Sequence, residues 1–162
     1  ATTVWMVFFG MNNATYPVLF LLLAEVGSDP LICTGMAPAN VAVGGACLAY
    51  ALLQKNNEEA KQVGIGSGIT ALCGITEPGV YGVLLKFKLP MIIMCLVNGI
   101  GGAICAVFHV TRDVQISVNL LTIPAIWVVY GPAAIVAIAI SFVGSFILTF
   151  LFGYSDKMLE KQ

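Results

Sequence analysis

Charged residues are scarce in this chain. Among 162 residues there are 7 lysines and arginines and 8 aspartates and glutamates, for a net charge of −1. No run of basic residues occurs, so the sequence lacks the electrostatic footprint of a nucleic-acid-binding protein. The five cysteines show neither a Cys-x-x-Cys spacing nor a Cys/His ligand pattern. We therefore predict no disulfide framework, no metal site and no cofactor, and expect the cysteines to be small packing residues.

Hydrophobic residues are abundant instead. They make up 59% of the chain, and the mean hydropathy is +0.98, which indicates an integral membrane protein of the all-α class. Since a spanning helix takes about 20 residues, the length allows about four or five membrane passes and little else. The chain begins Ala1-Thr2-Thr3 without a start Met or a charged leader, so we expect a piece of a longer protein.

Some of the apolar segments are uninterrupted, and others contain polar or helix-breaking residues. Three are expected to span the membrane as helices: 31–53, 91–110 and 128–152. Two are broken near the middle by polar and helix-breaking residues, so each is expected to form two short arms: 4–26 and 63–87. The segment 114–127 is too short to cross and is expected to be re-entrant or interfacial. Residues 1–155 would then form one membrane domain, and 156–162 a polar tail.

The second broken segment is interrupted by the pentapeptide Gly74-Ile75-Thr76-Glu77-Pro78. Gly74 supplies a stop for the preceding arm, because glycine tolerates the left-handed conformation at a helix end. A residue before proline is disfavoured in the α region, so Glu77 is expected to be extended. Pro78 is preset for the first turn of a new helix, which Thr76 or Glu77 would cap.

The pentapeptide is expected to lie near mid-membrane. The arm 64–73 has about 10 residues and reaches about half the apolar thickness. Non-helical backbone at that depth is tolerated where it lines a cavity, and a carboxylate there costs on the order of 3 kcal/mol unless it faces water or a partner. Glu77 is therefore the leading candidate for binding a polar ligand. The alternative is an ion pair or hydrogen bond that joins two helices, and for Asn12, a second candidate, that alternative is equally strong.

The lysines distinguish two topologies. If segment 63–87 enters and leaves on one side, all lysines share that side: Lys55, Lys61, Lys86, Lys88, Lys157 and Lys161. The positive-inside rule makes that side cytoplasmic. If the segment instead crosses once as a kinked helix, Lys55 and Lys61 lie opposite the others. We favour the re-entrant hairpin, with a cytoplasmic C-terminus.

The decapeptide 74–83, Gly-Ile-Thr-Glu-Pro-Gly-Val-Tyr-Gly-Val, is followed by Lys86-Phe87-Lys88 and Pro90. These residues resemble the membrane permease component, IIC, of the sugar phosphotransferase system (PTS), in its glucose superfamily and its β-glucoside, sucrose and trehalose branch. The closing residues 148–153, Leu-Thr-Phe-Leu-Phe-Gly, are similar to the usual end of that permease. The resemblance covers nearly the whole chain, but only the C-terminal portion of such a permease.

The resemblance implies a transport, sugar-binding domain built of transmembrane helices and re-entrant hairpins in the bacterial cytoplasmic membrane. It also implies translocation of a sugar, a β-glucoside or similar disaccharide, coupled to phosphorylation by a separate IIB domain. The phosphocysteine of that domain is absent here, and no catalytic residue is assigned to this chain. The implied partners are the N-terminal half of the permease, the IIB domain, the lipid bilayer and a second copy in a homodimer.

The resemblance also implies residue roles. The Glu77 carboxylate would accept hydrogen bonds from sugar hydroxyls, Thr76 and tip amides such as that of Gly74 would add others, and Tyr81 would offer a hydroxyl or a stacking face. The chain departs from the family at one position: where the family has a Gly-x-His pattern, this chain has Gly10-Met11-Asn12. Asn12 thus replaces a substrate-contacting histidine with a residue that can bond sugars but cannot titrate. Leu84 likewise stands where this branch often has asparagine.

Two other classes of function are compatible with parts of this pattern. An intramembrane enzyme could use Glu77 as an acid or base, but such chemistry normally needs a second carboxylate, a histidine or a metal nearby, and the sequence offers no convincing partner. A non-transporting structural or regulatory subunit, as a degenerate or split permease fragment, remains open.

Overall fold

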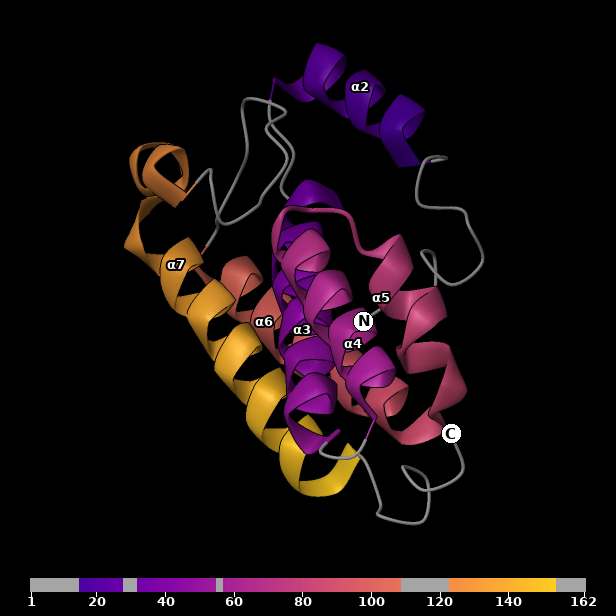
Figure 1. Cartoon of the computed structure of the whole chain (residues 1–162). Coiled ribbons are helices and arrows are strands. Elements are labelled where there is room, and N and C mark those ends of the chain that lie inside the picture. Colours follow the sequence, from indigo (N-terminus) through magenta and orange to yellow (C-terminus); the bar gives the residue numbers. More distant parts are fainter. Residues whose placement is uncertain (1–14, 28–31, 55–56, 109–122, 154–162) are drawn as a thin grey trace.

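The computed structural model describes residues 15–27, 32–54, 57–108 and 123–153, and every element in these ranges is helical (Figure 1), which confirms the predicted all-α class. The α-helices are α2 (Thr15–Val26), α3 (Ile32–Leu53), α4 (Glu58–Leu72), α5 (Glu77–Gly82), α6 (Lys88–Val107) and α7 (Ile123–Leu148). A 3-10 turn, η2 (Leu84–Lys86), leads into α6, and a π-helical turn, η4 (Thr149–Gly153), follows α7.

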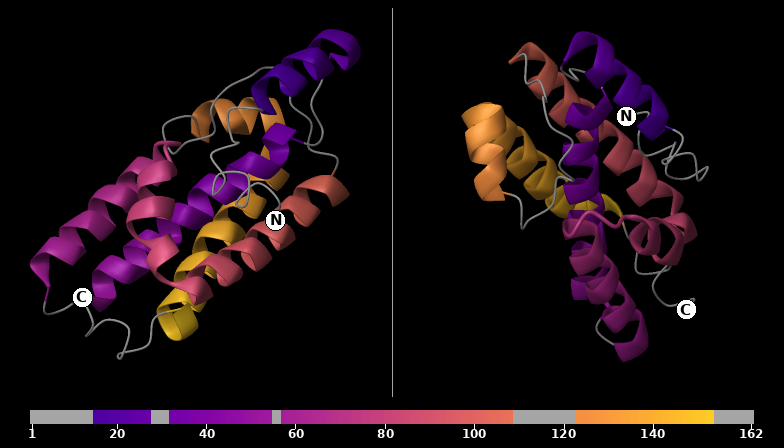
Figure 2. Two further views of the ribbon diagram at one scale, coloured as in Figure 1. Left: turned by 90° about the vertical axis from the view of Figure 1, so that its right-hand side faces the viewer. Right: turned by 90° about the horizontal axis from the view of Figure 1, so that it is seen from above.

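Helix α3 is the centre of the bundle and contacts α4, α6 and α7 (Figures 1 and 2). Glycines make the closest approaches. A Cβ on Gly64 of α4 would lie 2.9 Å from the Cβ of Ala51, and a Cβ on Gly45 of α3 would lie 2.9 Å from the carbonyl oxygen of Phe142. In lipid, where apolar surface gains little by leaving the solvent, such close packing of small residues holds helices together.

A buried apolar cluster joins α3 to α5, η2 and the start of α6. The rings of Tyr50 and Phe87 pack with centroids 5.6 Å apart. The largest members of the cluster are Val43, Cys47, Tyr50, Val80, Val83, Leu84, Phe87 and Met94. This cluster fixes the short helix α5 against α3 and thereby positions the residues of the pentapeptide.

Two helices among the described residues are long and apolar enough to cross a membrane, Leu89–Val107 and Ala134–Gly153. They overlap the predicted spans 91–110 and 128–152. The predicted span 31–53 corresponds to α3, of which Pro38–Leu53 is a shorter apolar helix. Large apolar side chains on the outer surfaces of the two long helices are exposed, such as Leu96 and Leu151. These surfaces suit contact with acyl chains.

Helix α4 begins earlier than the sequence analysis placed it. The apolar segment was expected to begin at residue 63, whereas the helix starts at Glu58. Asn57 caps it, with its Oδ1 accepting a hydrogen bond from the Ala60 amide at 3.1 Å. Glu58 and Glu59 add negative charge to the first turn, where the helix dipole favours it.

Helix α7 also begins earlier than predicted. It runs from Ile123 as one element, so the boundary placed between residues 127 and 128 is wrong. Pro124 lies in the first turn, where a missing amide hydrogen costs nothing. Residues 109–122, which contain most of the segment expected to be re-entrant or interfacial, lie outside the described residues. In the first broken segment, Pro17 lies in the first turn of α2, and the predicted first arm lies outside the described residues.

Two serines one turn apart on α7 make a matched test of buried polar groups. Ser141 and Ser145 are both 0% exposed. The Ser145 hydroxyl donates to the Ala42 carbonyl at 2.7 Å, whereas the Ser141 hydroxyl has no partner among the described residues. We expect Ser145→Ala to lower the free energy of unfolding by about 1 kcal/mol and Ser141→Ala to leave it unchanged or raise it. Thermal melts of the two variants in one detergent measure the difference, and equal losses would contradict it.

Candidate functional site

The turn after α4 is a Schellman motif. The Ile75 amide donates to the Thr70 carbonyl at 2.9 Å, and the Gly74 amide donates to the Ala71 carbonyl at 3.0 Å. Gly74 has a φ of 95°, in the left-handed region that glycine adopts without a steric penalty. The glycine thus ends α4 as predicted. Its amide is engaged in the turn, so Gly74 shapes the tip rather than offering its amide to a ligand.

Helix α5 runs back along α4 after this turn. The Ser67 hydroxyl donates to the Pro78 carbonyl at 3.4 Å. Further along, a Cβ on Gly82 would lie 3.8 Å from the Ser67 hydroxyl and 3.8 Å from a methyl group of Val63. Helix α4 and the returning arm, which consists of α5 and η2, therefore form a helical hairpin. The pentapeptide lies at its tip, and the start of α4 and the end of η2 form its base.

Glu77 is helical rather than extended, which corrects the sequence expectation. It is the first residue of α5, and the Val80 amide donates to the Thr76 carbonyl at 2.9 Å to close that turn. The preference of a residue before proline for extended backbone is overcome here because Gly79 and Val80 are held against α3. Thr76 occupies the N-cap position without a side-chain capping bond, so the predicted cap is also absent.

The two faces of α5 differ sharply. The inner face packs on α3, where Gly79 leaves no space for a side chain and Val80 is 1% exposed. The outer face carries Glu77, which is exposed, and Tyr81, which is 45% exposed. Because these two residues are four apart, they lie one above the other on the same face. No hydrogen bond or ion pair engages the Glu77 carboxylate within the described residues.

The remaining predicted residues are distributed differently. Thr76 is 3% exposed, so its side chain is buried inside the tip and does not lie on the outer face of α5. Asn12 lies outside the described residues. Leu84, noted for replacing an asparagine, is 1% exposed in the cluster that anchors α5. The structure thus brings together Gly74, Thr76, Glu77 and Tyr81.

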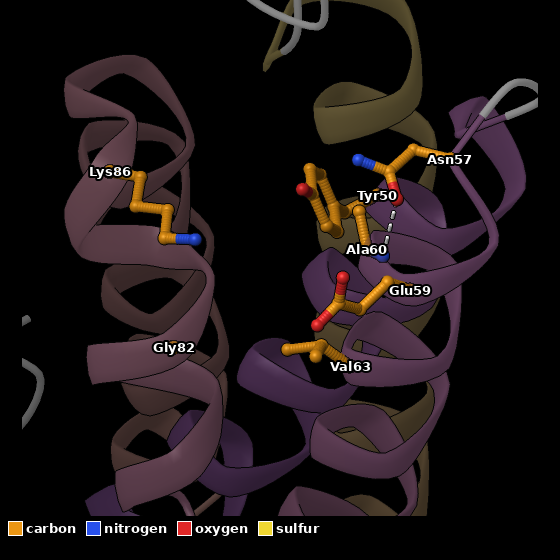
Figure 3. Close-up of a pocket in the computed structure, with 7 residues that line it drawn as sticks. All are labelled: Tyr50, Asn57, Glu59, Ala60, Val63, Gly82 and Lys86. Atoms are coloured by element: carbon orange, nitrogen blue, oxygen red, sulfur yellow. Dashed lines mark hydrogen bonds between the residues drawn. The ribbon is translucent and has the colours of Figure 1, made fainter. Parts of the chain in front are cut away.

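Sequence reasoning missed a second polar location at the opposite end of the hairpin. A cavity of about 320 Å³ opens between the first turns of α4 and the end of the returning arm (Figure 3). Glu59 lines it from α4 and Lys86 from η2. In the sequence, Lys86 indicates topology alone, and no local motif links it to Glu59.

Comparisons with known proteins identify the family. The family described as phosphotransferase system, EIIC matches residues 3–99, more than half of the chain. The chain is 30% identical over 157 residues to the arbutin-, cellobiose- and salicin-specific PTS EIIBC component of Escherichia coli K12, covering 94% of this chain and 32% of that protein. It is 36% identical over 119 residues to the sucrose-specific EIIBC component of Pasteurella multocida, covering 72% and 25%.

A third relative, the β-glucoside-specific EIIBCA component of Bacillus subtilis, is 31% identical over 150 residues, covering 91% of this chain and 24% of that protein. No solved structure matches the chain. The chain spans about a third or less of the length of these curated relatives. The resemblance seen in the decapeptide 74–83 is confirmed, and the chain belongs to the EIIC family of the phosphotransferase system.

Proposed function

We propose that this chain forms part of the sugar-binding transport domain of an EIIC permease, and that it binds a β-glucoside or similar disaccharide on the outer face of α5. The carrying observation is the exposed Glu77 carboxylate beside Tyr81 at the hairpin tip, in a chain with only 9% charged residues. A carboxylate accepts hydrogen bonds from several hydroxyls at once, and a tyrosine adds a hydroxyl and a ring face. Thr76 and Gly74 then serve to position the tip, and Asn12 remains a candidate for a further sugar contact.

The hairpin is proposed to be re-entrant, with its tip near mid-membrane. Its two arms lie side by side, so the returning arm ends near the level at which α4 begins. The first turn of α4 carries Glu58, Glu59 and Lys61, so residues 62–72 are the part that extends into the apolar layer. This part is about 16 Å long, about half of an apolar thickness of about 30 Å. In alternating access, a ligand at the tip would be reached from the opposite side of the membrane in one state and from the side of the hairpin base in the other.

The base of the hairpin is proposed to face the cytoplasm. Lys61 and Lys86 lie there, and Lys88 begins α6 at the same end. The end of η4, the turn that follows α7, is there too, since a Cβ on Gly153 would lie 3.4 Å from Pro90. This grouping of basic residues supports the positive-inside assignment and a cytoplasmic C-terminus for the multi-pass chain.

Coupling to phosphorylation is part of the proposal. The sequence analysis expected a separate IIB domain, whereas the relatives' names join the B and C components in one EIIBC protein. We propose that a IIB domain, whether fused or separate, phosphorylates the sugar carried by this domain. The N-terminal half of the permease would supply the wall of the sugar site that faces α5. It would also form the homodimer, against which the transport domain moves.

A binding assay distinguishes transport from a regulatory role. We expect radiolabelled cellobiose to bind saturably to the full-length permease reconstituted in lipid vesicles, with unlabelled salicin or sucrose as competitors. Uptake into vesicles carrying the IIB domain and a phosphoryl donor should yield the phosphorylated sugar inside. If none of these sugars binds saturably to a well-folded preparation, the non-transporting subunit becomes the better description.

A further inference from the structure

The cavity at the hairpin base has the size and lining of a small-molecule site. Its volume of about 320 Å³ is at the lower end of the range for ligand pockets. Four elements line it: α3 through Tyr50, α4 through residues such as Val63, α5 through Gly82, and η2 through Lys86. Neither Glu77 nor Tyr81 lines it, so it is separate from the tip.

Charges of opposite sign line facing walls of this cavity. Figure 3 shows Lys86 projecting from the returning arm toward α4, and Glu59 lying across from it. Within the described residues, the ion pair that forms is between Lys61 and Glu58, at 3.7 Å on α4. Neither Lys86 nor Glu59 has a partner among those residues. As far as the described residues are concerned, the ammonium and carboxylate are thus free to contact a ligand.

A third polar group lies beside them. The Asn57 side-chain oxygen is engaged by the Ala60 amide, which leaves its NH₂ group free to donate, and Figure 3 shows that group turned toward the cavity. The cavity therefore offers an ammonium and an amide as donors and a carboxylate as acceptor. Tyr50 and Val63 supply apolar surface between them.

This set of groups selects for a ligand with two kinds of polar atoms. A lone phosphate ion would gain from Lys86 but be repelled by Glu59. A neutral sugar would satisfy Glu59 through its hydroxyls but leave the ammonium without an anionic partner. A molecule that carries both hydroxyls and a phosphate group satisfies both walls, because the hydroxyls donate to the carboxylate and the phosphate oxygens accept from the ammonium.

We propose that this cavity is an exit subsite for the phosphorylated sugar. The inference rests on the proposed function, which makes a sugar phosphate the product at this end of the hairpin. Phosphorylation adds a charge of about −1.5 to −2 at neutral pH, which the Glu77 carboxylate at the tip repels and the Lys86 ammonium attracts. The two sites therefore differ in charge preference, and the difference favours movement of the product from the tip toward the base.

Calorimetric titration of the full-length permease tests the exit subsite, with glucose 6-phosphate as the probe and glucose and inorganic phosphate for comparison. We expect glucose 6-phosphate to bind more tightly than either. Lys86→Met, which keeps the aliphatic stem but removes the charge, should weaken glucose 6-phosphate binding about tenfold or more. Glu59→Gln should narrow the preference for glucose 6-phosphate over inorganic phosphate. Lys61→Met removes a nearby lysine outside the cavity and should bind as wild type does.

Two variants distinguish the exit subsite from the sugar site at the tip. Glu77→Gln should weaken cellobiose binding while leaving glucose 6-phosphate binding intact, and Lys86→Met should do the reverse. Unchanged glucose 6-phosphate affinity in Lys86→Met, with an unshifted melting temperature, would refute the exit subsite. So would a loss of glucose 6-phosphate binding in Glu77→Gln alone, or no binding by the wild type up to about 10 mM. The glucose 6-phosphate results do not depend on whether Glu77 binds the unphosphorylated sugar, so the exit subsite and the sugar site at the tip can fail independently.

Discussion

Glu77→Gln is expected to weaken disaccharide binding by the full-length permease about tenfold or more. Glutamine keeps the size and reach of the side chain but removes its charge and replaces one acceptor oxygen with a donor. Hydrogen bonds to a charged group are worth about 1.5–3 kcal/mol, and each 1.4 kcal/mol is a factor of about ten in affinity. The dissociation constant for radiolabelled cellobiose, measured in vesicles, gives the result directly.

The weaker disaccharide binding of Glu77→Gln should not result from destabilisation of the fold. Glu77 is exposed and unpaired among the described residues, so its replacement is expected to change the free energy of unfolding by no more than about 0.5 kcal/mol. Glu58→Gln is the matched control, because Glu58 is also an exposed glutamate near the start of a helix, but lies at the opposite end of the hairpin. If both variants bind cellobiose as the wild type does, the sugar site does not include Glu77.

Gly79→Leu is expected to abolish sugar binding and to destabilise the domain. A Cβ at Gly79 would lie 2.7 Å from a methyl group of Val43 and 3.0 Å from the sulfur of Cys47. Both neighbours are buried in α3 and have little room to move, at 2% and 0% exposed. Overpacking of this kind costs about 1–3 kcal/mol, and the larger consequence is that α5 must move away from α3 with Glu77 and Tyr81.

Gly102→Leu is the control for this substitution. A Cβ at Gly102 meets no other atom within 4 Å, and the residue lies within a candidate membrane span. Leucine is also a better helix former than glycine. We therefore expect Gly102→Leu to keep both the melting temperature and cellobiose affinity, while Gly79→Leu lowers both. Equal behaviour of the two variants would mean that the packing of α5 on α3 does not hold the site.

Local signals in the sequence were sufficient where the structure depends on local bonds. The end of α4 is set by hydrogen bonds within residues 70–75, so Gly74 in front of a polar cluster predicted it correctly. The start of α4 is equally local, with Asn57 as cap and acids in the first turn. It was missed because the segment was expected to begin with its apolar residues, at residue 63. Asn57, Glu58 and Glu59 would have predicted the helix start if they had been interpreted as an N-cap and an acidic first turn.

Packing between distant segments could not be predicted in this way. Glu77 is helical because α5 is pressed onto α3, a contact that no preference of the dipeptide Glu77-Pro78 encodes. The cavity that contains Glu59 and Lys86 arises from the return of the chain, and their separation in the sequence matches no motif. Membership of the family was predictable because the decapeptide 74–83 is distinctive as a string of residues.

The hairpin has a consequence for the order of assembly. Its bond between Ser67 and Pro78 joins residues 11 apart, whereas the bond between Ser145 and Ala42, which ties α7 to α3, joins residues 103 apart. Closing a short loop costs less chain entropy and occurs sooner than closing a long one. The arms that present Glu77 can therefore pair while the last helix is still being synthesised, so that the proposed sugar-binding tip can form before the bundle closes.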